Sequence, residues 1–507
     1  VEVTLGDDPP HALIAGPSGS GTTNLIYAWL AALCARSAPR ELELYLLDFK
    51  EGVSFARFAP GRRDPSWLPH VRLIGINVNT DREFGLALLR HLGDELRRRA
   101  AAAKKLDAAK LAELREEDPD GRWPRIVAVV DEFQVLLAGR DPATTEAVTL
   151  LEDLARRGRS QGIHLILASQ DVSGIEALWG RSALVAQFTL RIALPKARRI
   201  LGETNLAAEL IPRFHAVVNA DSGAPGANHV VRLPNASARD AWRTLQEHLW
   251  HARPEDLAPP RLFDGDAVPV LPSLPPPASD VVEAVVGETI DVAGRPAVVR
   301  MTRAPGRNLA VLGARVDEAC AVLGAAGRSL GRMHAPGTAR FSVVCLDDDA
   351  LPAAKGLANE LPGAVLYDAS SVAALLASTV DDLDGPHYLI GYAWDAAAGQ
   401  LAAKPSGGGS SGHELLRTVL SRGPERRTHV LGWWRAVSRL RDDLGGVGAR
   451  FDAIGAWIAL DVHGGELSPL STVPGGPAWY PRPRRGLFFD RAVHRIPEVI
   501  IPYEVPA

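Results

Sequence analysis

Residues 16 to 23 have the sequence Gly-Pro-Ser-Gly-Ser-Gly-Thr-Thr. Glycines at such spacing let successive backbone N–H groups turn inward around phosphate oxygens, and a following helix presents its N-terminus to the anion. The segment fits the phosphate-binding pattern G-x-x-x-x-G-K-[ST] except that Thr22 stands where the pattern has lysine. We therefore predict ATP binding by Gly16, Pro17, Ser18, Gly19, Ser20, Gly21, Thr22, Thr23 and Asn24.

A second chemical feature is the carboxylate pair Asp131-Glu132, which follows the apolar run at 126–130. In phosphoryl transfer, one carboxylate after a buried strand positions Mg²⁺ and a neighbouring one orients or deprotonates the attacking water. We predict that Asp131 holds Mg²⁺ through water, that Thr23 ligates the ion directly, and that Glu132 acts on the water. The glycine loop alone could be a structural turn, and the carboxylate pair makes a nucleotide site the better interpretation.

Thr22 is the departure with the largest chemical consequence. The usual lysine bridges the β- and γ-phosphates and neutralises charge that develops during transfer. Losing one charge-assisted contact weakens binding by about 1.5 to 3 kcal/mol. The cost to catalysis is larger because the contact strengthens in the transition state. We expect this chain to bind nucleotide weakly and to hydrolyse it little.

Alternating strand and helix patterns position these residues. Near-continuous apolar runs, typical of strands covered on both faces, occur at 11–16, 42–49, 71–78, 125–133, 163–170 and 188–194. Helical spacing follows the glycine loop, and the polar segment 81–117 predicts a long exposed helix or a helical pair. The pattern predicts an α/β fold with mostly parallel sheets flanked by helices.

The chain also contains a degenerate internal repeat. HALIAG at 11–16 returns as NLAVLG at 308–313, and EDLARRGRSQGIHLI at 152–166 returns as RTVLSRGPERRTHVL at 417–431. Between the copies, residues 252–278 are rich in proline, which suits neither a helix interior nor a central strand. We predict a domain over 1–251, a linker over 252–278 and a related, shorter domain over 279–507.

The second copy lacks the chemical motifs of the first. Its phosphate-loop counterpart begins at Gly313 and places the acidic pair Asp317-Glu318 where phosphate would lie, and HYLIGYAWDAA at 387–397 has no adjacent carboxylate pair. We predict no catalysis there, but a structural role or the docking of a protein partner. Its tryptophans could line a peptide pocket or simply form core: Trp394, Trp433, Trp434, Trp457 and Trp479.

Composition excludes several classes of protein. Of 507 residues, 46% are hydrophobic and 23% charged, so the chain is neither disordered nor fibrous. The net charge of −4 provides no global basic field, so any contact with nucleic acid must be local. No apolar run reaches the roughly 18 residues of a membrane span. We expect a cytoplasmic protein whose numbering begins inside a longer polypeptide, the preceding part of which could carry a membrane anchor.

The strings PHALIAGPSGSGTTNLIYAWLAAL at 10–33, VAVVDEFQVLL at 127–137 and ARRGRSQGIHLILASQD at 155–171 resemble the motor domain of the FtsK/SpoIIIE family. The resemblance covers residues 1 to about 235 and implies two tandem RecA-like domains, the second degenerate. It also implies a hexameric ring in which a neighbour supplies an arginine finger, for which Arg156, Arg157 and Arg159 are candidates and Arg159 is the first choice. Gln170 matches a γ-phosphate sensor. Asp48 and Lys50 match the D-x-K pattern of a loop facing the channel or the neighbour.

Two substrate classes follow from the resemblance. The first is double-stranded DNA, which FtsK and SpoIIIE translocate, and we take a DNA-translocating motor as the main prediction. The second is protein, because the tandem layout also resembles the ATPases of type VII secretion, with an export substrate or partner at the C-terminal domain. A third alternative is a nucleotide-gated scaffold without turnover.

Overall fold

The computed structural model describes residues 3–50, 54–172, 175–178, 180–238, 240–272, 281–404 and 409–504. The chain forms two compact units. Unit 1 comprises Val1–Ala267 with Asp291–Ala293, and unit 2 comprises Val268–Ile290 with Gly294–Ala507. None of the helices in the described ranges is both long enough and apolar enough to cross a membrane.

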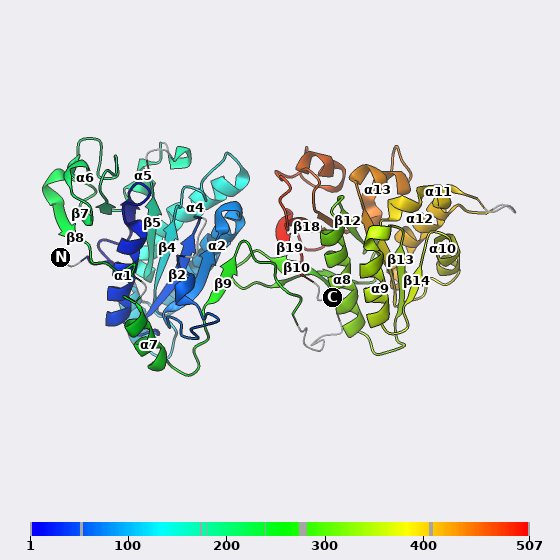
Figure 1. Ribbon diagram of the computed structural model, residues 1–507, viewed down its shortest axis with the longest axis horizontal. Coiled ribbons are helices and arrows are strands. Elements are labelled where there is room, and N and C mark those ends of the chain that lie inside the picture. Colours follow the sequence, from blue (N-terminus) through cyan, green and yellow to red (C-terminus); the bar gives the residue numbers. More distant parts are fainter. Residues whose placement is uncertain are drawn as a thin grey trace. The chain divides into compact units, whose positions relative to one another are not determined.

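Unit 1 is built on a nine-stranded sheet with the order β8-β7-β6-β1-β5-β4-β2-β3-β9 (Figure 1). All its strand pairs are parallel except those of β7 with β6 and β8. The strands are β1 (Ala12–Ala15), β2 (Leu42–Asp48), β3 (Val71–Ile76), β4 (Arg125–Asp131), β5 (Ile163–Ser169), β6 (Leu190–Ala193), β7 (His215–Asn219), β8 (Asn228–Arg232) and β9 (Arg261–Asp264). The predicted α/β class is confirmed.

Helices cover both faces of this sheet, which explains its apolar strands. Ala12 and Ile14 of β1 pack in one core cluster with Leu30 of α1, whereas Leu13 lines a small apolar gap with Leu151 of α4. The polar segment 81–117 forms the predicted helical pair, α2 and α3. The helices are α1 (Thr22–Arg36), α2 (Arg82–Lys105), α3 (Leu111–Glu117), α4 (Pro142–Arg157), α5 (Ser182–Val185), α6 (Ala207–Leu210) and α7 (Arg243–His251).

The register of the parallel strands gathers the chemical residues at one edge. Asp48 at the end of β2 lies opposite Asp131 at the end of β4, and Ala15 of β1 lies opposite Ser169 of β5. Because parallel strands end at the same edge, the glycine loop after β1, the carboxylates after β4 and Gln170 after β5 share that edge.

The predicted linker over 252–278 needs a correction. Arg261–Asp264 forms β9, which pairs in parallel with β3 at the edge of the first sheet. The flanking Pro259 and Pro260 exclude a central strand but not a short edge strand, whose outer side needs no ladder partner. The rest of that stretch is without helix or strand through residue 272, and its residues 273–278 lie outside the described ranges.

Unit 2 has a ten-stranded sheet with the order β11-β10-β19-β18-β17-β12-β16-β15-β13-β14. Its strands are β10 (Glu283–Thr289), β11 (Pro296–Arg300), β12 (Leu309–Leu312), β13 (Arg340–Cys345), β14 (Val365–Tyr367), β15 (His387–Tyr392), β16 (Thr428–Trp434), β17 (Ala456–Ala459), β18 (Gly486–Asp490) and β19 (Glu498–Ile501). Its helices are α8 (Val316–Arg332), α9 (Leu351–Glu360), α10 (Val372–Asp381), α11 (Ala398–Ala402), α12 (Gly412–Arg422) and α13 (Val437–Asp443). The parallel run β17-β12-β16-β15-β13-β14 repeats the order β6-β1-β5-β4-β2-β3 of unit 1.

The repeat extends to individual hydrogen bonds at the start of the central strands. The His164 ring donates from Nδ1 to the Pro10 carbonyl at 2.8 Å, and the His429 ring donates from Nδ1 to the Arg307 carbonyl at 2.7 Å. In unit 1 the backbone N–H of Leu165 donates to His11 Nδ1 at 3.0 Å, and in unit 2 that of Val430 donates to Asn308 Oδ1 at 2.9 Å. The two units therefore share one architecture despite their divergent sequences.

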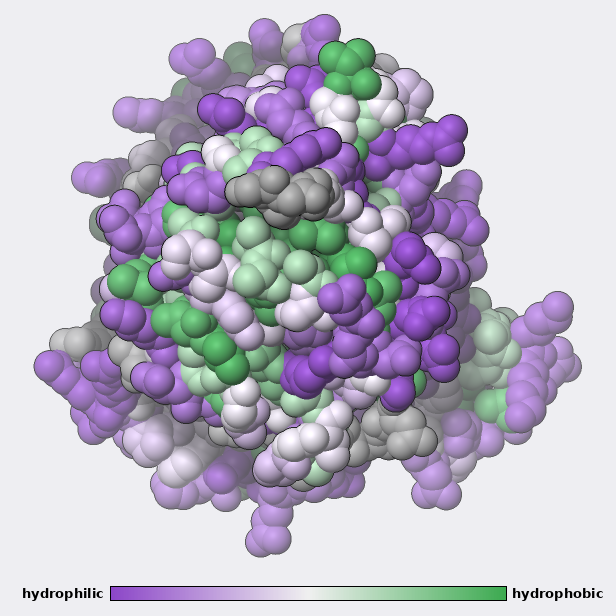
Figure 2. Space-filling view, turned by 90° about the vertical axis from the view of Figure 1, so that its right-hand side faces the viewer, coloured by the Kyte–Doolittle hydropathy of each residue, from purple (hydrophilic) through white to green (hydrophobic). Residues whose placement is uncertain are grey.

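The tryptophans of unit 2 form core rather than a peptide pocket. Trp394, Trp433 and Trp434 are 0% exposed, Trp457 is 1% and Trp479 is 6% exposed. Unit 2 also exposes apolar residues on its surface. Figure 2 shows hydrophobic residues gathered on the face that carries α10 and β14 in Figure 1.

Candidate nucleotide site

The glycine loop connects β1 to α1 through residues 16–21. Gly19 and Gly21 have φ angles of 77° and 108°, in the left-handed region that favours glycine. A Cβ on Gly16 would lie 2.7 Å from the Cβ of Leu194, so only glycine fits there. Thr22 then begins α1 and is 8% exposed. The loop therefore has the open turn and helix N-terminus that a phosphate requires.

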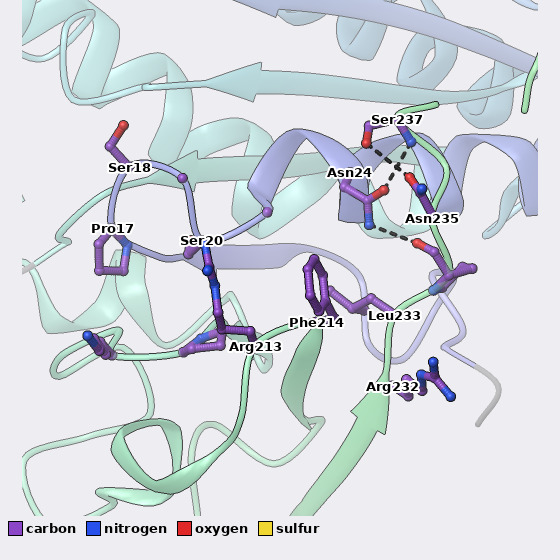
Figure 3. Close-up of a pocket in the computed structure, with 15 residues that line it drawn as sticks. Pro17, Ser18, Ser20, Asn24, Arg213, Phe214, Arg232, Leu233, Asn235 and Ser237 are labelled. Carbon is purple, nitrogen blue, oxygen red and sulfur yellow. Dashed lines mark hydrogen bonds between the residues drawn. The ribbon is translucent and has the colours of Figure 1, made fainter. Parts of the chain in front are cut away.

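A cavity of about 1070 Å³ lies beside this loop. Arg213 and Phe214 extend from the segment before β7 toward the loop (Figure 3). The adjacent segment after β8 is tied to them, because the N–H of Leu233 donates to the carbonyl of Phe214 at 2.8 Å. Among the described residues, the lining includes three basic side chains, Lys196, Arg213 and Arg232, and no acidic one. An aromatic and aliphatic wall next to a glycine loop with three cations suits a base attached to a polyphosphate.

The sequence prediction missed the residues of this cavity outside the loop. Lys196, Arg213, Phe214 and Arg232 come from connections and strand ends after β6, where no motif marks them. Phe214 carries one signal, because it is 70% exposed and has a φ of 63°, unusual for an aromatic residue. That signal exists only in the folded chain.

Asn24 has a structural task at this site. Its side-chain amide donates to the Pro234 carbonyl at 2.8 Å, and its Oδ1 accepts from the N–H groups of Ala236 and Ser237 at 2.8 and 3.0 Å (Figure 3). These bonds hold the segment after β8 against the first turn of α1. Asn24 thus shapes the cavity wall, and direct contact with nucleotide stays a prediction.

The carboxylate pair lies where the sequence predicts it, at the end of β4, and is deeply buried. Asp131 is 1% and Glu132 3% exposed. Gln170 donates from Nε2 to Glu132 Oε1 at 3.0 Å, and Gln134 donates to the other oxygen of Glu132. The predicted Asp131, Glu132 and Gln170 are therefore brought together by the fold.

Lys50 completes this cluster, in a way the sequence did not predict. Its Nζ lies 3.3 Å from Asp131 Oδ2 and 2.9 Å from Glu132 Oε1. The D-x-K pattern implied a loop facing the channel or a neighbour, which stays a prediction; in this chain the Lys50 ammonium contacts both carboxylates. The backbone N–H of Lys50 also donates to Asp48 Oδ1 at 2.9 Å, which fixes the turn after β2.

Burial and charge set the pKa values of this cluster. Burial raises the pKa of Asp131 to about 6, against the opposing attraction of Lys50. Burial also acts to raise the pKa of Glu132, but hydrogen bonds from Gln134, Gln170 and Lys50 outweigh it and lower that pKa. For Lys50, burial is outweighed by Asp131 and Glu132, which raise its pKa and keep the ammonium charged.

The residues as arranged do not fit a magnesium ion well. The Thr23 hydroxyl and the Asp131 carboxylate are oxygen donors of the kind Mg²⁺ prefers. However, the Lys50 ammonium already contacts Asp131, and a cation beside a cation is unfavourable. Ligation by Thr23 and Asp131 stays a prediction.

Arg159 lies far from this edge within its own unit. It belongs to a short 3-10 turn, Gly158–Gln161, which precedes the amino end of β5, whereas the glycine loop follows the carboxyl end of the parallel β1. Its side chain is exposed. The position excludes contact with the phosphate loop of the same unit, so the predicted finger role would have to act on another copy of the chain.

The corresponding edge of unit 2 has lost the nucleotide features. Only residues 313–315 join β12 to α8, too few to wrap a phosphate. The N–H of Ala314 instead donates to Asp461 Oδ1 at 2.7 Å, so an internal carboxylate takes the anion's place. By strand register, Tyr392 and Ala393 stand where unit 1 has Asp131 and Glu132.

A different ion network occupies that edge. By the same register, Asp347 replaces Lys50 and Arg435 replaces Gln170. Arg435 pairs with Asp347 at 3.4 Å and with Asp395 at 2.9 Å. The edge of unit 2 is thus closed by its own side chains.

Residues 1–174 match the model of the FtsK/SpoIIIE family, so unit 1 carries an FtsK/SpoIIIE-family domain. Among curated proteins, the ESX secretion system protein EccC of Geobacillus thermodenitrificans is 26% identical over 212 residues, covering 40% of this chain and 13% of that protein. The type VII secretion system protein EssC of Staphylococcus aureus is 30% identical over 179 residues, covering 34% and 11%. The chain thus aligns with only a small part of these relatives.

Solved structures show the same fold over both units. The cytoplasmic domain of the Thermomonospora curvata type VII secretion ATPase EccC has a TM-score of 0.65 at 21% identity, covering 97% of this chain and 60% of that one. ATPases 2 and 3 of T. curvata EccC, solved with a signal sequence peptide, have a TM-score of 0.60 at 16% identity, covering 100% and 90%. The two units therefore have the fold of tandem ATPase domains.

Proposed function

We propose that unit 1 binds a nucleoside triphosphate, ATP, at the glycine loop and turns it over slowly. The observation that carries the proposal is the cavity beside the loop, whose described lining has three basic side chains and no acidic one. The loop and the N-terminus of α1 would hold the phosphates, while Phe214 and Leu233 offer an apolar wall to the base. Because Thr22 cannot neutralise the charge that develops during phosphoryl transfer, we expect hydrolysis to be impaired more than nucleotide binding.

The role that we propose is that of a module in a protein-export ATPase of the type VII secretion kind. The tandem layout and the similarity to EccC and EssC support this role. Double-stranded DNA, the main expectation from the sequence, has no comparable support. The same proposal includes a homo-oligomeric ring in which Arg159 reaches the nucleotide phosphates bound by the neighbouring copy. It also includes nucleotide gating without sustained turnover.

For unit 2 we propose an export-substrate peptide as the partner. A structural neighbour of this chain was solved with a signal sequence peptide. The face that carries α10 and β14 exposes apolar residues, with Val365 50% exposed (Figure 2). A contiguous apolar patch of this kind is typical of a protein contact. Val365→Asp should then weaken binding of an apolar helical peptide, measured by fluorescence anisotropy, and leave nucleotide binding unchanged.

The experiment that tests nucleotide binding is a titration of the full chain with a fluorescent ATP analogue. Arg213→Ala should weaken binding about tenfold, because it removes a charge-assisted contact. Arg97→Ala is the matched control, since that arginine is exposed on α2 and pairs with Asp94, three residues earlier in the same helix. Equal affinities for both variants and the parent would refute the placement of the phosphates in this cavity.

A further inference from the structure

The ends of β2 and β4 bring three carboxylates together in unit 1. Asp48 is 0% exposed, Asp131 is 1% and Glu132 is 3% exposed. Buried carboxylates are costly unless a cation or hydrogen bonds compensate them. The described part of the chain places one cation, the Lys50 ammonium, within ion-pair distance of both Asp131 and Glu132. The Lys50 ammonium thus lies where the buried carboxylates need a compensating charge.

Unit 2 supplies an internal comparison. Where unit 1 has Asp48, Asp131 and Glu132, the register of unit 2 places Cys345, Tyr392 and Ala393. The position of Lys50 is then taken by an aspartate, Asp347, which pairs with Arg435 at the end of β16, two strands away in the sheet. The fold itself therefore does not require a lysine after this strand. The lysine is present in the unit that has the carboxylates and absent from the equivalent position of the unit that lacks them.

The cavity beside the glycine loop is an independent observation. A triphosphate brings about four negative charges, and a divalent cation ordinarily neutralises part of them. Here Lys196, Arg213 and Arg232 line the cavity, and no acidic side chain joins them in the part of the chain that the structure describes. Protein cations are therefore available for the phosphates, and a protein cation already compensates the carboxylates.

We propose that Lys50 is a built-in counter-ion that takes the place of the divalent cation at Asp131 and Glu132, so that unit 1 binds nucleoside triphosphate without Mg²⁺. This inference rests on the proposed nucleotide binding. It assigns to Lys50 a role in charge balance at the carboxylates, while the cavity cations hold the phosphates.

The test is a titration of the full chain with a fluorescent ATP analogue, in millimolar Mg²⁺ and in EDTA. We expect the affinity of the parent chain to change less than about threefold between the two conditions. Lys50→Met removes the charge at similar length, so its affinity should fall about tenfold or more in EDTA and recover in Mg²⁺. Lys50→Arg keeps the charge and should behave as the parent. Lys104→Met, at an exposed position of α2, is the matched control.

A second readout needs no nucleotide. With Lys50 removed, Mg²⁺ should raise the melting temperature of Lys50→Met, because the buried carboxylates then accept the ion, and leave the parent and Lys104→Met unchanged. A tenfold loss of parent affinity in EDTA, or an equal effect of Mg²⁺ on all melting temperatures, overturns the inference. If no variant binds nucleotide, the proposed function fails, and the melting temperatures alone decide the role of Lys50.

Discussion

Thr22→Lys should convert this chain into a tighter nucleotide binder. Position 22 begins α1, directly after the positive-φ turn of Gly21, where the N-terminus of the helix would face the phosphates of a bound nucleotide. A lysine there adds one charge-assisted contact, worth about 1.5 to 3 kcal/mol, which corresponds to about 10- to 150-fold in affinity. Lys50 does not already supply this contact, because its ammonium lies on Asp131 and Glu132.

The assay combines a titration with a fluorescent ATP analogue and the rate of phosphate release. Thr22→Met is the matched control, because it has nearly the length of lysine without the charge. We expect tighter binding and measurable hydrolysis for Thr22→Lys only, since the contact strengthens in the transition state. Unchanged affinity for Thr22→Lys, or an equal gain for Thr22→Met, would refute the reasoning.

The same assay separates the two substrate classes. Hydrolysis by Thr22→Lys is measured with and without double-stranded DNA. No response to DNA is the result that the protein-export proposal expects. Stimulation of several-fold would restore the DNA-translocating motor that the sequence predicts first.

Three further predictions concern the two units separately. Arg307→Met should destabilise unit 2 by about 3 to 5 kcal/mol, because it leaves the buried carboxylate of Asp490 without its cationic partner. Arg307 contacts that carboxylate at 2.6 and 2.9 Å. A loss of less than about 1 kcal/mol in the free energy of urea unfolding would contradict this. Burial lowers the pKa of both His164 and His429 to about 4. Their contribution to stability is therefore present above pH 6.5 and is lost as pH falls toward 4, by up to about 1.4 kcal/mol per pH unit for each ring. Replacing both histidines by glutamine should make the melting temperature less dependent on pH between 6.5 and 4. ATP should slow amide hydrogen exchange at the glycine loop but not at residues 313–315, and equal protection would contradict the loss of the second site.

The sequence by itself determined the fold class and the first half of the site. Strand runs with helical spacing between them predicted the α/β layers, because apolar periodicity reflects which faces are buried. The glycine loop and Asp131-Glu132 were found because their chemistry depends on residues adjacent in sequence. The internal repeat was visible through His164 and His429, whose buried hydrogen bonds recur in both units.

Only the tertiary structure decided how charge is distributed around that site. Lys50 and Glu132 are 82 positions apart in the sequence, yet the pairing of β2 with β4 brings Lys50 Nζ to 2.9 Å from Glu132 Oε1. The cavity cations Lys196, Arg213 and Arg232 likewise converge from two connections and a strand end that carry no motif. Spacing along the chain does not reveal such contacts, because strand order and register, rather than sequence distance, set which side chains meet at the edge of a parallel sheet.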